Sequence, residues 1–470
     1  MSIKITDKTL CCGCEACVQI CAHDAIIMEE DNEGFRYPVV NTNLCVECGL
    51  CEKVCQYNDM PTKHTEKKYA FGGYHLNPEV RFESTSGGAF SAIVDAFCDE
   101  NYVIFGAEAK GLEVFHSYIE DKADLAKFRK SKYSQSVIGN SYKQVKAFLK
   151  EGKKVLFSGT PCQIAGLRSY IRNTNQDNLL TVEVICEGVP SPLYVRKWDK
   201  HLRKCYGCGI ASIDYRYTGK ALFQKGKWDF QQTDIELEDS SWGGVNPWRP
   251  SGKWDFEQVN IELEDMKRII KDRWFNPFWS IWLNHLMSRP SCYKCRFTTA
   301  ERGADITLGD LWGVHLYCPE LYGSNGGSSL IVCNTEKGKA VFAKAQKKMY
   351  GHELAFEDAL RYQSPMRKCI SENPERDRFL EDLQSDMTYE AINKKWAKPS
   401  SLKLLIAKYV WGSNRQMVAW WYFKRLISKI FIRQKVIDMT IKNRMGGGKT
   451  QIVFMMRSNC ANVESFKLCA

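Results

Sequence analysis

Long apolar runs are missing from this chain of 470 residues. No stretch approaches 18 consecutive apolar residues, so we expect no helix to span a membrane. Residues 1–10 lack the apolar core of a secretory signal, so we expect none. Residues 394–444 contain thirteen Lys or Arg residues but a single acidic residue, Asp438. The net charge of +11 is therefore a property of this tail, and the rest of the chain is close to neutral.

Cysteine, in contrast, is abundant, with 21 residues that mostly fall in short runs. Thiols in such number are typical of a reducing compartment, so we expect a cytoplasmic protein. Two runs share the spacing C-x2-C-x2-C-x3-C, namely Cys11, Cys14, Cys17 and Cys21, then Cys45, Cys48, Cys51 and Cys55. This spacing is typical of two-cluster ferredoxins, in which the fourth cysteine of each run ligates the other cluster.

We therefore predict two 4Fe-4S clusters with crossed ligands. One set is Cys11, Cys14, Cys17 and Cys55, and the other is Cys45, Cys48, Cys51 and Cys21. Zinc knuckles or a disulfide scaffold are the alternative, but zinc sites do not need the third cysteine of each run. Ala22 and Gln56 follow the runs, where proline is usual, and Cys12 has the position of a spare thiol.

The cysteine runs, an α/β pattern and a basic tail divide the chain into three parts. Residues 1–60 have the pattern of an α+β ferredoxin-like dicluster module. Residues 68–385 have that of an α/β domain with an inserted β segment, and residues 386–470 form a basic, aromatic tail that we expect to be helical. The inserted segment holds a duplication, in which residues 227–239 match residues 253–265 at ten of thirteen positions. We assign no chemistry to it.

A strand–helix–strand unit occupies residues 153–185. The first strand ends at Gly159-Thr160-Pro161-Cys162, and the next strand, 181–185, ends at Cys186. Such a unit predicts parallel strands, and cofactors bind outside the carboxyl ends of parallel strands. We therefore expect Cys162 and Cys186 to face the same crevice.

An ordered set of motifs gives residues 1–385 a family resemblance. The motifs are Ser86-Gly87-Gly88, Lys132-Tyr133 with Gln135-Ser136, Ser158-Gly159-Thr160-Pro161-Cys162-Gln163, Ile185-Cys186 with Gly188-Val189-Pro190-Ser191-Pro192, Cys292-x2-Cys295, and Asp305-Ile306 with Gly309-Asp310-Leu311-Trp312-Gly313. Together they resemble the beta subunits of coenzyme F₄₂₀-reducing hydrogenases and dehydrogenases, fused here to a dicluster ferredoxin. Glu187 departs from the histidine that is common in relatives, and the duplication and the tail lie outside the resemblance.

The resemblance implies FAD in the α/β domain and a third 4Fe-4S cluster beside it. We assign that cluster to Cys162, Cys186, Cys292 and Cys295. The alternatives are that Cys162 and Cys186 are ordinary buried thiols, or that Cys205 and Cys208 are ligands instead. The flavin contacts that we predict are Ser86, Gly87, Gly88, Lys130, Lys132 and Thr160. The backbone N–H groups of the glycine turn would bind the flavin pyrophosphate, and the lysines would neutralise its charge. The alternatives are that Gly87-Gly88 is an ordinary turn before a helix and that the two lysines are solvated surface charges.

Two functions fit these features. The first is an iron–sulfur flavoprotein oxidoreductase that receives electrons from ferredoxin or another redox partner and reduces an unidentified small molecule, with coenzyme F₄₂₀ one candidate. The second is an electron-transfer subunit without a substrate of its own. For the tail, peripheral contact with the inner membrane face competes with packing on the α/β domain, and nucleic acid is a less favoured partner.

Overall fold

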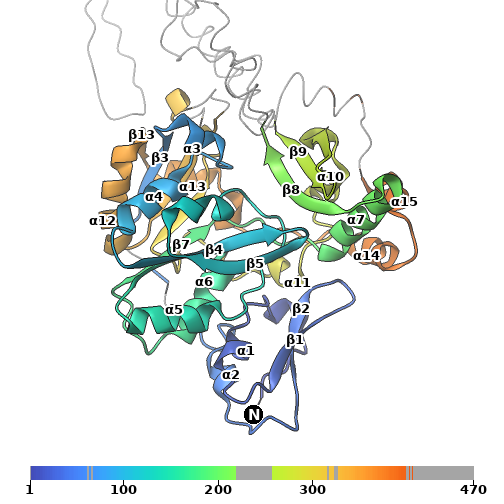
Figure 1. The fold of residues 1–470 in the computed structure, drawn as a ribbon, viewed down its shortest axis with the longest axis horizontal. Coiled ribbons are helices and arrows are strands. Elements are labelled where there is room, and N and C mark those ends of the chain that lie inside the picture. The colour runs from blue at the N-terminus through green and yellow to red at the C-terminus, as the bar shows by residue number, and fades with distance from the viewer. Residues whose placement is uncertain are drawn as a thin grey trace, which may run out of the picture. The chain divides into compact units, whose positions relative to one another are not determined.

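The cysteine-rich N-terminal segment folds as a small α+β module. The computed structural model describes residues 2–60, 63–64, 67–218, 257–314, 317–321 and 326–397, with Leu402 and Leu405. In the module, β1 (Ile26–Glu30) pairs antiparallel with β2 (Arg36–Val40). The short helices α1 (Ala16–Ile20) and α2 (Leu50–Lys53) each follow the first two cysteines of a run (Figure 1).

An eight-stranded sheet forms the centre of the α/β domain. Its order is β13-β3-β12-β11-β7-β6-β4-β5. The bounds are β3 (Tyr69–His75), β4 (Tyr102–Lys110), β5 (Glu113–Ile119), β6 (Lys154–Gly159), β7 (Leu179–Val184), β11 (Ile306–Asp310), β12 (Ser329–Cys333) and β13 (Met349–Leu354). Strands β4, β6, β7 and β11 run parallel, which confirms the predicted pairing of β6 with β7. Strand β3 runs the same way, because β3 and β11 are both antiparallel to β12.

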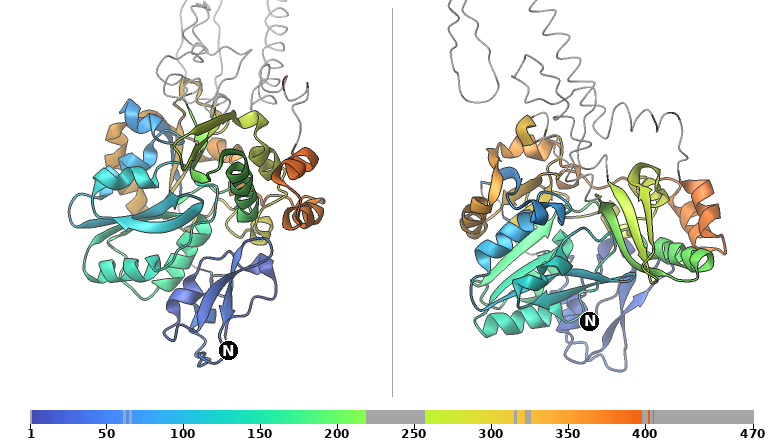
Figure 2. Two further views of the ribbon diagram at one scale, coloured as in Figure 1. Left: turned by 45° about the vertical axis from the view of Figure 1, so that its right-hand side comes forward. Right: turned by 45° about the horizontal axis from the view of Figure 1, so that its top comes forward.

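Helices cover both faces of this sheet, as a parallel core requires. On one face lie α4 (Ala89–Phe97) and α12 (Glu336–Ala345), and on the other α5 (Ser141–Lys150) and α6 (Pro161–Tyr170) (Figure 2). Strand β6 shows the alternation, since Leu156 packs in the first core and Val155 and Phe157 pack in the second. Short helices α3 (Pro78–Phe82), α11 (Pro290–Tyr293) and α13 (Phe356–Arg361) complete the domain.

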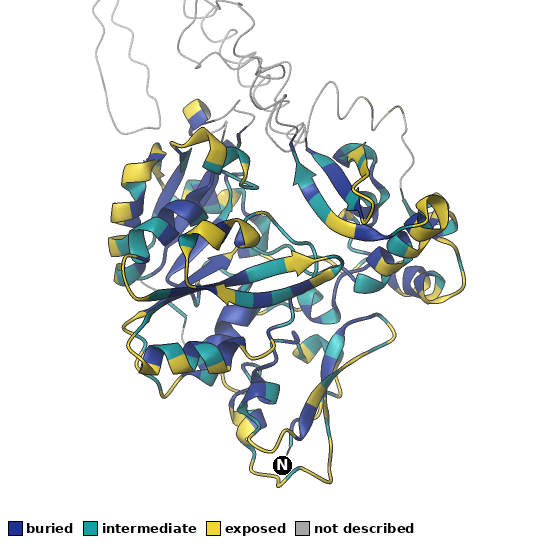
Figure 3. Cartoon of the chain, viewed as in Figure 1, coloured by how far each residue is buried: buried dark blue, intermediate teal, exposed yellow. Residues whose placement is uncertain are grey.

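A second, three-stranded sheet has its own hydrophobic core. Its order is β10-β9-β8, with β8 (Ile210–Tyr217), β9 (Gln258–Leu263) and β10 (Arg268–Asp272). Packed with it are α7 (Pro192–Tyr206), α10 (Pro277–Leu283), α14 (Arg376–Gln384) and α15 (Tyr389–Trp396), whose inward faces are buried (Figure 3). The second copy of the duplication supplies β9, whereas the first copy lies outside the described residues.

The predicted tail begins with an ordered, packed helix. In α15, Tyr389 and Ile392 are buried in the core of the three-stranded sheet, so this part of the tail packs on its own chain. Apart from Leu402 and Leu405, the tail beyond residue 397, including its Trp and Lys/Arg cluster, lies outside the described residues. Among the helices described, none is long and apolar enough to cross a membrane.

Candidate metal centres

Four cysteines from both runs meet in one small hollow of the module. These are Cys11, Cys14, Cys17 and Cys55, which we call the inner set, and apolar residues such as Ile3 and Met28 complete the lining. Burial raises the pKa of Cys17, and the neighbouring thiols of the other three raise it further. The convergence of Cys55 with the first run is the arrangement that the crossed ligand sets predict.

The other predicted set, Cys21, Cys45, Cys48 and Cys51, is the outer set. Backbone N–H groups donate to two of its sulfurs, from Ile3 to Cys51 Sγ at 3.3 Å and from Ala25 to Cys21 Sγ at 3.4 Å. These two contacts tie the sulfurs to the backbone of the module. Cys48 is exposed, so this set reaches the surface of the module.

The third predicted set, Cys162, Cys186, Cys292 and Cys295, lines a cavity of about 280 Å³. Cys162 lies in the first turn of α6, Cys186 follows β7, and the other two come from α11 and the residues after it. The expectation that Cys162 and Cys186 face one crevice is therefore confirmed. Neither residue of the rival pair, Cys205 and Cys208, lines this cavity.

Burial makes these thiols costly to ionise without a cation. It raises the pKa of Cys292 to about 12 and that of Cys295 to about 11. A coordinated metal reverses this preference, because a ligating thiol is deprotonated outright. Glu187, at the position where relatives commonly have histidine, also lines the cavity, and burial raises the pKa of its carboxyl group.

Cys12, which the sequence marks only as a spare thiol, lies between two of the sets. Cys12 lines both the hollow of the inner set and the cavity of the third set, and its thiol, which can donate to one sulfur at a time, lowers the pKa of Cys14 and of Cys162. Gln56 reinforces this junction, because its Nε2 donates to Cys12 Sγ at 3.0 Å and to the Cys162 carbonyl at 2.9 Å. Gln56 stands where proline is usual, and this departure is a sequence signal that could have indicated its hydrogen bonds to Cys12 and Cys162.

Cys369 is a second cavity residue that the sequence did not indicate. Its thiol donates to the Cys295 carbonyl at 3.2 Å and lies 3.0 Å from Thr298 Oγ1. No local motif surrounds it, and only the fold brings it to Cys295.

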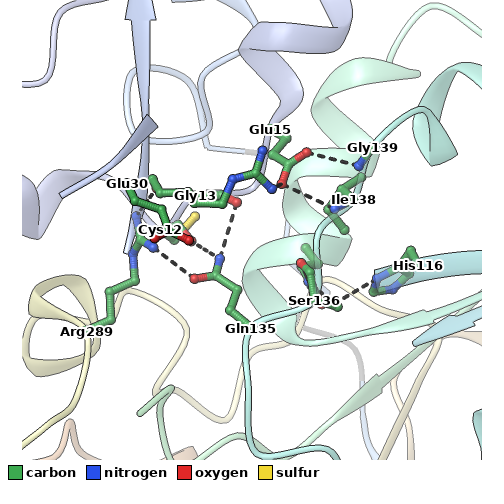
Figure 4. A network of polar contacts seen from close by, with 12 residues as sticks. Cys12, Gly13, Glu15, Glu30, His116, Gln135, Ser136, Ile138, Gly139 and Arg289 are labelled. Carbon is green, nitrogen blue, oxygen red and sulfur yellow. Dashed lines mark hydrogen bonds and ion pairs between the residues drawn. The ribbon is translucent and has the colours of Figure 1, made fainter. Parts of the chain in front are cut away.

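Buried polar contacts hold the module against the α/β domain (Figure 4). Gln135 Nε2 donates to the Cys12 carbonyl at 2.7 Å, and Gln135 Oε1 accepts from Arg289 Nη1 at 2.9 Å. Glu15 accepts from the backbone N–H groups of Ile138 and Gly139 at 3.3 and 3.0 Å. The loop of the inner set is therefore fixed in position relative to the third set.

Another motif residue, Ser136, belongs to a buried network behind Cys162. Ser136 Oγ accepts from Gln163 Nε2 at 2.8 Å and lies 2.9 Å from His116 Nδ1. Gln163 Oε1 in turn accepts from the Thr160 N–H at 3.0 Å and so caps the helix that carries Cys162. Burial lowers the pKa of His116 to about 4, so the ring is neutral at pH 7.

The predicted flavin contacts have their polar groups engaged within the chain. The Gly87 N–H donates to Ser329 Oγ at 2.8 Å, and a side chain at Gly87 would lie 2.5 Å from the Gly73 carbonyl. Lys130 pairs with Asp214 at 2.8 Å. Lys132 Nζ donates to two backbone carbonyls, and burial lowers its pKa to about 8.

These residues therefore do not form an open cradle for a pyrophosphate. Of the remaining contacts, Ser86 Oγ donates to the Ser328 carbonyl at 2.7 Å, Gly88 is the left-handed N-cap of α4, and Thr160 is the N-cap of α6. Ser86 and Gly88 follow β3, and Thr160 follows β6, and the carboxyl ends of these two strands lie at one edge of the sheet. Cofactors of α/β domains bind at this edge.

Comparison with known proteins agrees with this arrangement. Residues 152–358 match the family described as the C-terminal part of the coenzyme F₄₂₀ hydrogenase/dehydrogenase beta subunit, and residues 10–58 match the 4Fe-4S dicluster domain. The chain thus resembles this beta-subunit family over residues 152–358 and carries a 4Fe-4S dicluster domain over residues 10–58. The predicted resemblance is confirmed, and both N-terminal cysteine runs lie within the region that matches a 4Fe-4S dicluster domain.

Individual relatives are more distant. A coenzyme F₄₂₀-dependent sulfite reductase from Methanocaldococcus jannaschii is 27% identical over 168 residues, which are 35% of this chain and 26% of that protein. The chain thus matches about a quarter of the length of this relative. A chain of the F₄₂₀-reducing NiFe hydrogenase complex from Methanosarcina barkeri aligns over 71% of this chain and 91% of its own, at 14% identity. Its TM-score of 0.38 is too low to carry an argument.

Proposed function

We propose that this beta-subunit-like chain is an iron–sulfur oxidoreductase in which electrons pass from the outer set through the inner set to a third 4Fe-4S cluster. The third cluster would be held by Cys162, Cys186, Cys292 and Cys295 at the cavity. The observation that carries the proposal is the position of Cys12, which lines both the hollow of the inner set and the cavity of the third set. Two centres joined through one buried residue are suited to direct electron transfer.

The direction of entry follows from exposure. The outer set includes the exposed Cys48, whereas the third set lines a cavity at the carboxyl edge of the sheet. A redox partner such as a ferredoxin would therefore dock at the outer set, and a small molecule would be reduced at the cavity. The M. jannaschii relative is named as an F₄₂₀-dependent enzyme, which supports an oxidoreductase and makes coenzyme F₄₂₀ a candidate second partner.

FAD remains the expected link between one-electron and two-electron chemistry. Its predicted contacts at Gly87, Lys130 and Lys132 are satisfied within the chain, so we derive no step through it. Extraction of flavin from anaerobically purified protein is the direct test. Gly87→Val is unsuitable for locating it, because the side chain would collide with the Gly73 carbonyl whether or not flavin binds.

Metal analysis and a redox titration test the relay. Three clusters predict about twelve irons per chain, and Cys186→Ser should remove about four of them. Cys12→Ala should keep all twelve, because Cys12 is not a ligand, but it removes a hydrogen bond to a cluster sulfur. That loss should move the reduction potential of an adjacent cluster to a more negative value.

Cys98→Ala is the matched control for Cys12→Ala. Cys98 is also a buried thiol, but it packs in the apolar core beside α4 and does not line the cavity of the third set. It should change neither iron content nor potentials. Eight irons in the intact chain, or identical titrations of the wild type and Cys12→Ala, would refute the relay through the third set.

A further inference from the structure

A mixed cluster of metal-binding side chains lies apart from the cavity. Cys318 and Glu320 belong to the connection between β11 and β12, and His352 lies on the edge strand β13. Cys318 Sγ is 3.1 Å from Glu320 Oε1, and His352 Nε2 is 3.7 Å from the same oxygen. The three ligand atoms all lie within 4.8 Å of one another. None of these residues lines the cysteine cavity.

The spacing fits a tetrahedral ion. Zinc bonds of about 2.0–2.3 Å to sulfur, nitrogen and oxygen put neighbouring ligand atoms about 3.3–3.8 Å apart. Two of the observed separations, 3.1 and 3.7 Å, are close to that range. The third is at most 4.8 Å, which a small side-chain rotation closes.

His352 supplies an independent observation. A thiol–carboxylate hydrogen bond accounts for the distance between Cys318 and Glu320, but it leaves the histidine unexplained. His352 Nε2 itself is shielded from solvent, although the side chain is 43% exposed. It lies 3.7 Å from Glu320 Oε1, beyond hydrogen-bond distance, and has no hydrogen-bond partner among the described residues. A buried ring nitrogen aimed at a thiol and a carboxylate is the arrangement that a metal ion satisfies.

We propose that Cys318, Glu320 and His352 bind a zinc ion. One sulfur, one nitrogen and one oxygen suit a borderline-soft divalent ion, whereas an all-oxygen site would suit magnesium or calcium. The side chains of His352 and Glu320 are 43% and 47% exposed, so the fourth position is accessible to water. Binding releases the Cys318 proton, because the thiolate is the ligand.

The fold gives this ion a structural role. Strands β12 and β3 lie between β11 and the edge strand β13. The zinc would therefore link the connection that follows β11 directly to β13. The same connection ends at Ser328, whose carbonyl accepts from Ser86 Oγ at 2.7 Å. Zinc would thereby stabilise the sheet edge next to the glycine turn. The site does not depend on the proposed relay.

Zinc analysis of the full-length chain, purified anaerobically and dialysed against a weak chelator, tests the proposal. We expect about one zinc per chain in addition to the iron, and X-ray absorption at the zinc edge should show one sulfur near 2.3 Å with nitrogen and oxygen at about 2.0–2.2 Å. Cys318→Ala and His352→Ala should each lose the zinc and keep the iron.

Cys205→Ala is the control. The exposed Cys205 Sγ is 3.8 Å from His201 Nδ1, but that nitrogen already pairs with Glu390 at 2.8 Å, and the three ligand atoms do not converge as those of Cys318, Glu320 and His352 do. It should retain zinc. A zinc-free wild type would overturn the proposal. So would a zinc with four sulfur ligands, which would indicate an ion in an iron–sulfur site, and the spectrum of the wild type decides this even if a variant does not fold.

Discussion

Arg289 should contribute more to the attachment of the N-terminal module than any exposed ion pair across the same interface. Its guanidinium is 1% exposed and donates to the Cys11 carbonyl at 3.1 Å, to Gln135 Oε1 at 2.9 Å and to the Arg36 carbonyl at 2.9 Å. It also lies 4.3 Å from the centre of the Tyr37 ring. Arg289→Met removes all of these contacts while it keeps much of the volume.

The magnitude follows from two opposing terms. Hydrogen bonds from a charged donor contribute about 1.5–3 kcal/mol each, so three contribute about 5–9 kcal/mol. Burial of the guanidinium costs several kcal/mol, and methionine does not bear this cost. We therefore expect Arg289→Met to lower the free energy of unfolding of the docked module by about 2–4 kcal/mol.

Arg196 provides the comparison. It forms a two-pronged pair with Glu30 of the module at 2.5 and 2.7 Å, but the two side chains are 47% and 42% exposed. Exposed pairs contribute about 0–1 kcal/mol. Anaerobic urea unfolding, followed by cluster absorbance and by circular dichroism, should show a much larger loss for Arg289→Met than for Arg196→Met. Equal losses would refute the argument from burial.

Three further predictions concern other regions. Burial lowers the pKa of His116 to about 4, whereas the pKa in the unfolded chain is about 6.5. The neutral ring therefore contributes fully to the free energy of unfolding above pH 6.5, and about 3 kcal/mol of that free energy is lost as the pH falls to 4. His116→Gln should flatten the pH profile of urea unfolding in that window, and an unchanged profile would contradict this. Arg302→Met leaves the buried Glu183 carboxylate without its ion-pair partner and should lower the free energy of unfolding by about 3–5 kcal/mol. A variant with both residues changed to methionine should lose less. Equal losses of the two variants in urea unfolding would show that the unpaired charge is not responsible. Removal of residues 398–470, which spares α15, should abolish salt-sensitive sedimentation with anionic liposomes, and equal binding by the shortened chain would place the membrane contact elsewhere.

Local patterns explain why the proximity of several of these cysteines could be predicted. Cys11, Cys14 and Cys17 are held by one short loop, so their spacing alone indicates a cluster. Cys162 and Cys186 were predictable for another reason, since consecutive parallel strands place their carboxyl ends at one edge of the sheet. Both inferences need only the chain within about thirty residues.

Long-range partners explain what was not predictable. Cys12 became a junction residue only through Cys162, 150 positions later in the sequence. Cys369 reaches Cys295 through the fold of the intervening 73 residues. The Gly87 N–H has the pattern of a phosphate donor, but Ser329, on a distant strand, accepts its hydrogen bond. Sequence pattern identifies groups that can bind, whereas tertiary contacts decide which of them are already satisfied.

The position of Arg289 joins attachment of the module to its redox chemistry. Four thiolates around an iron–sulfur cluster carry negative charge, and every added electron increases it. Arg289 is a buried cation whose charge is felt by Cys11 in the inner set and by Cys292 in the third set. In the proposed relay Arg289 would therefore lower the electrostatic cost of reducing either centre, at the interface between the module and the α/β domain. Loss of Arg289 should make both potentials more negative, whereas loss of Gln56, which has no charge, should act only through its hydrogen bonds to Cys12 and Cys162.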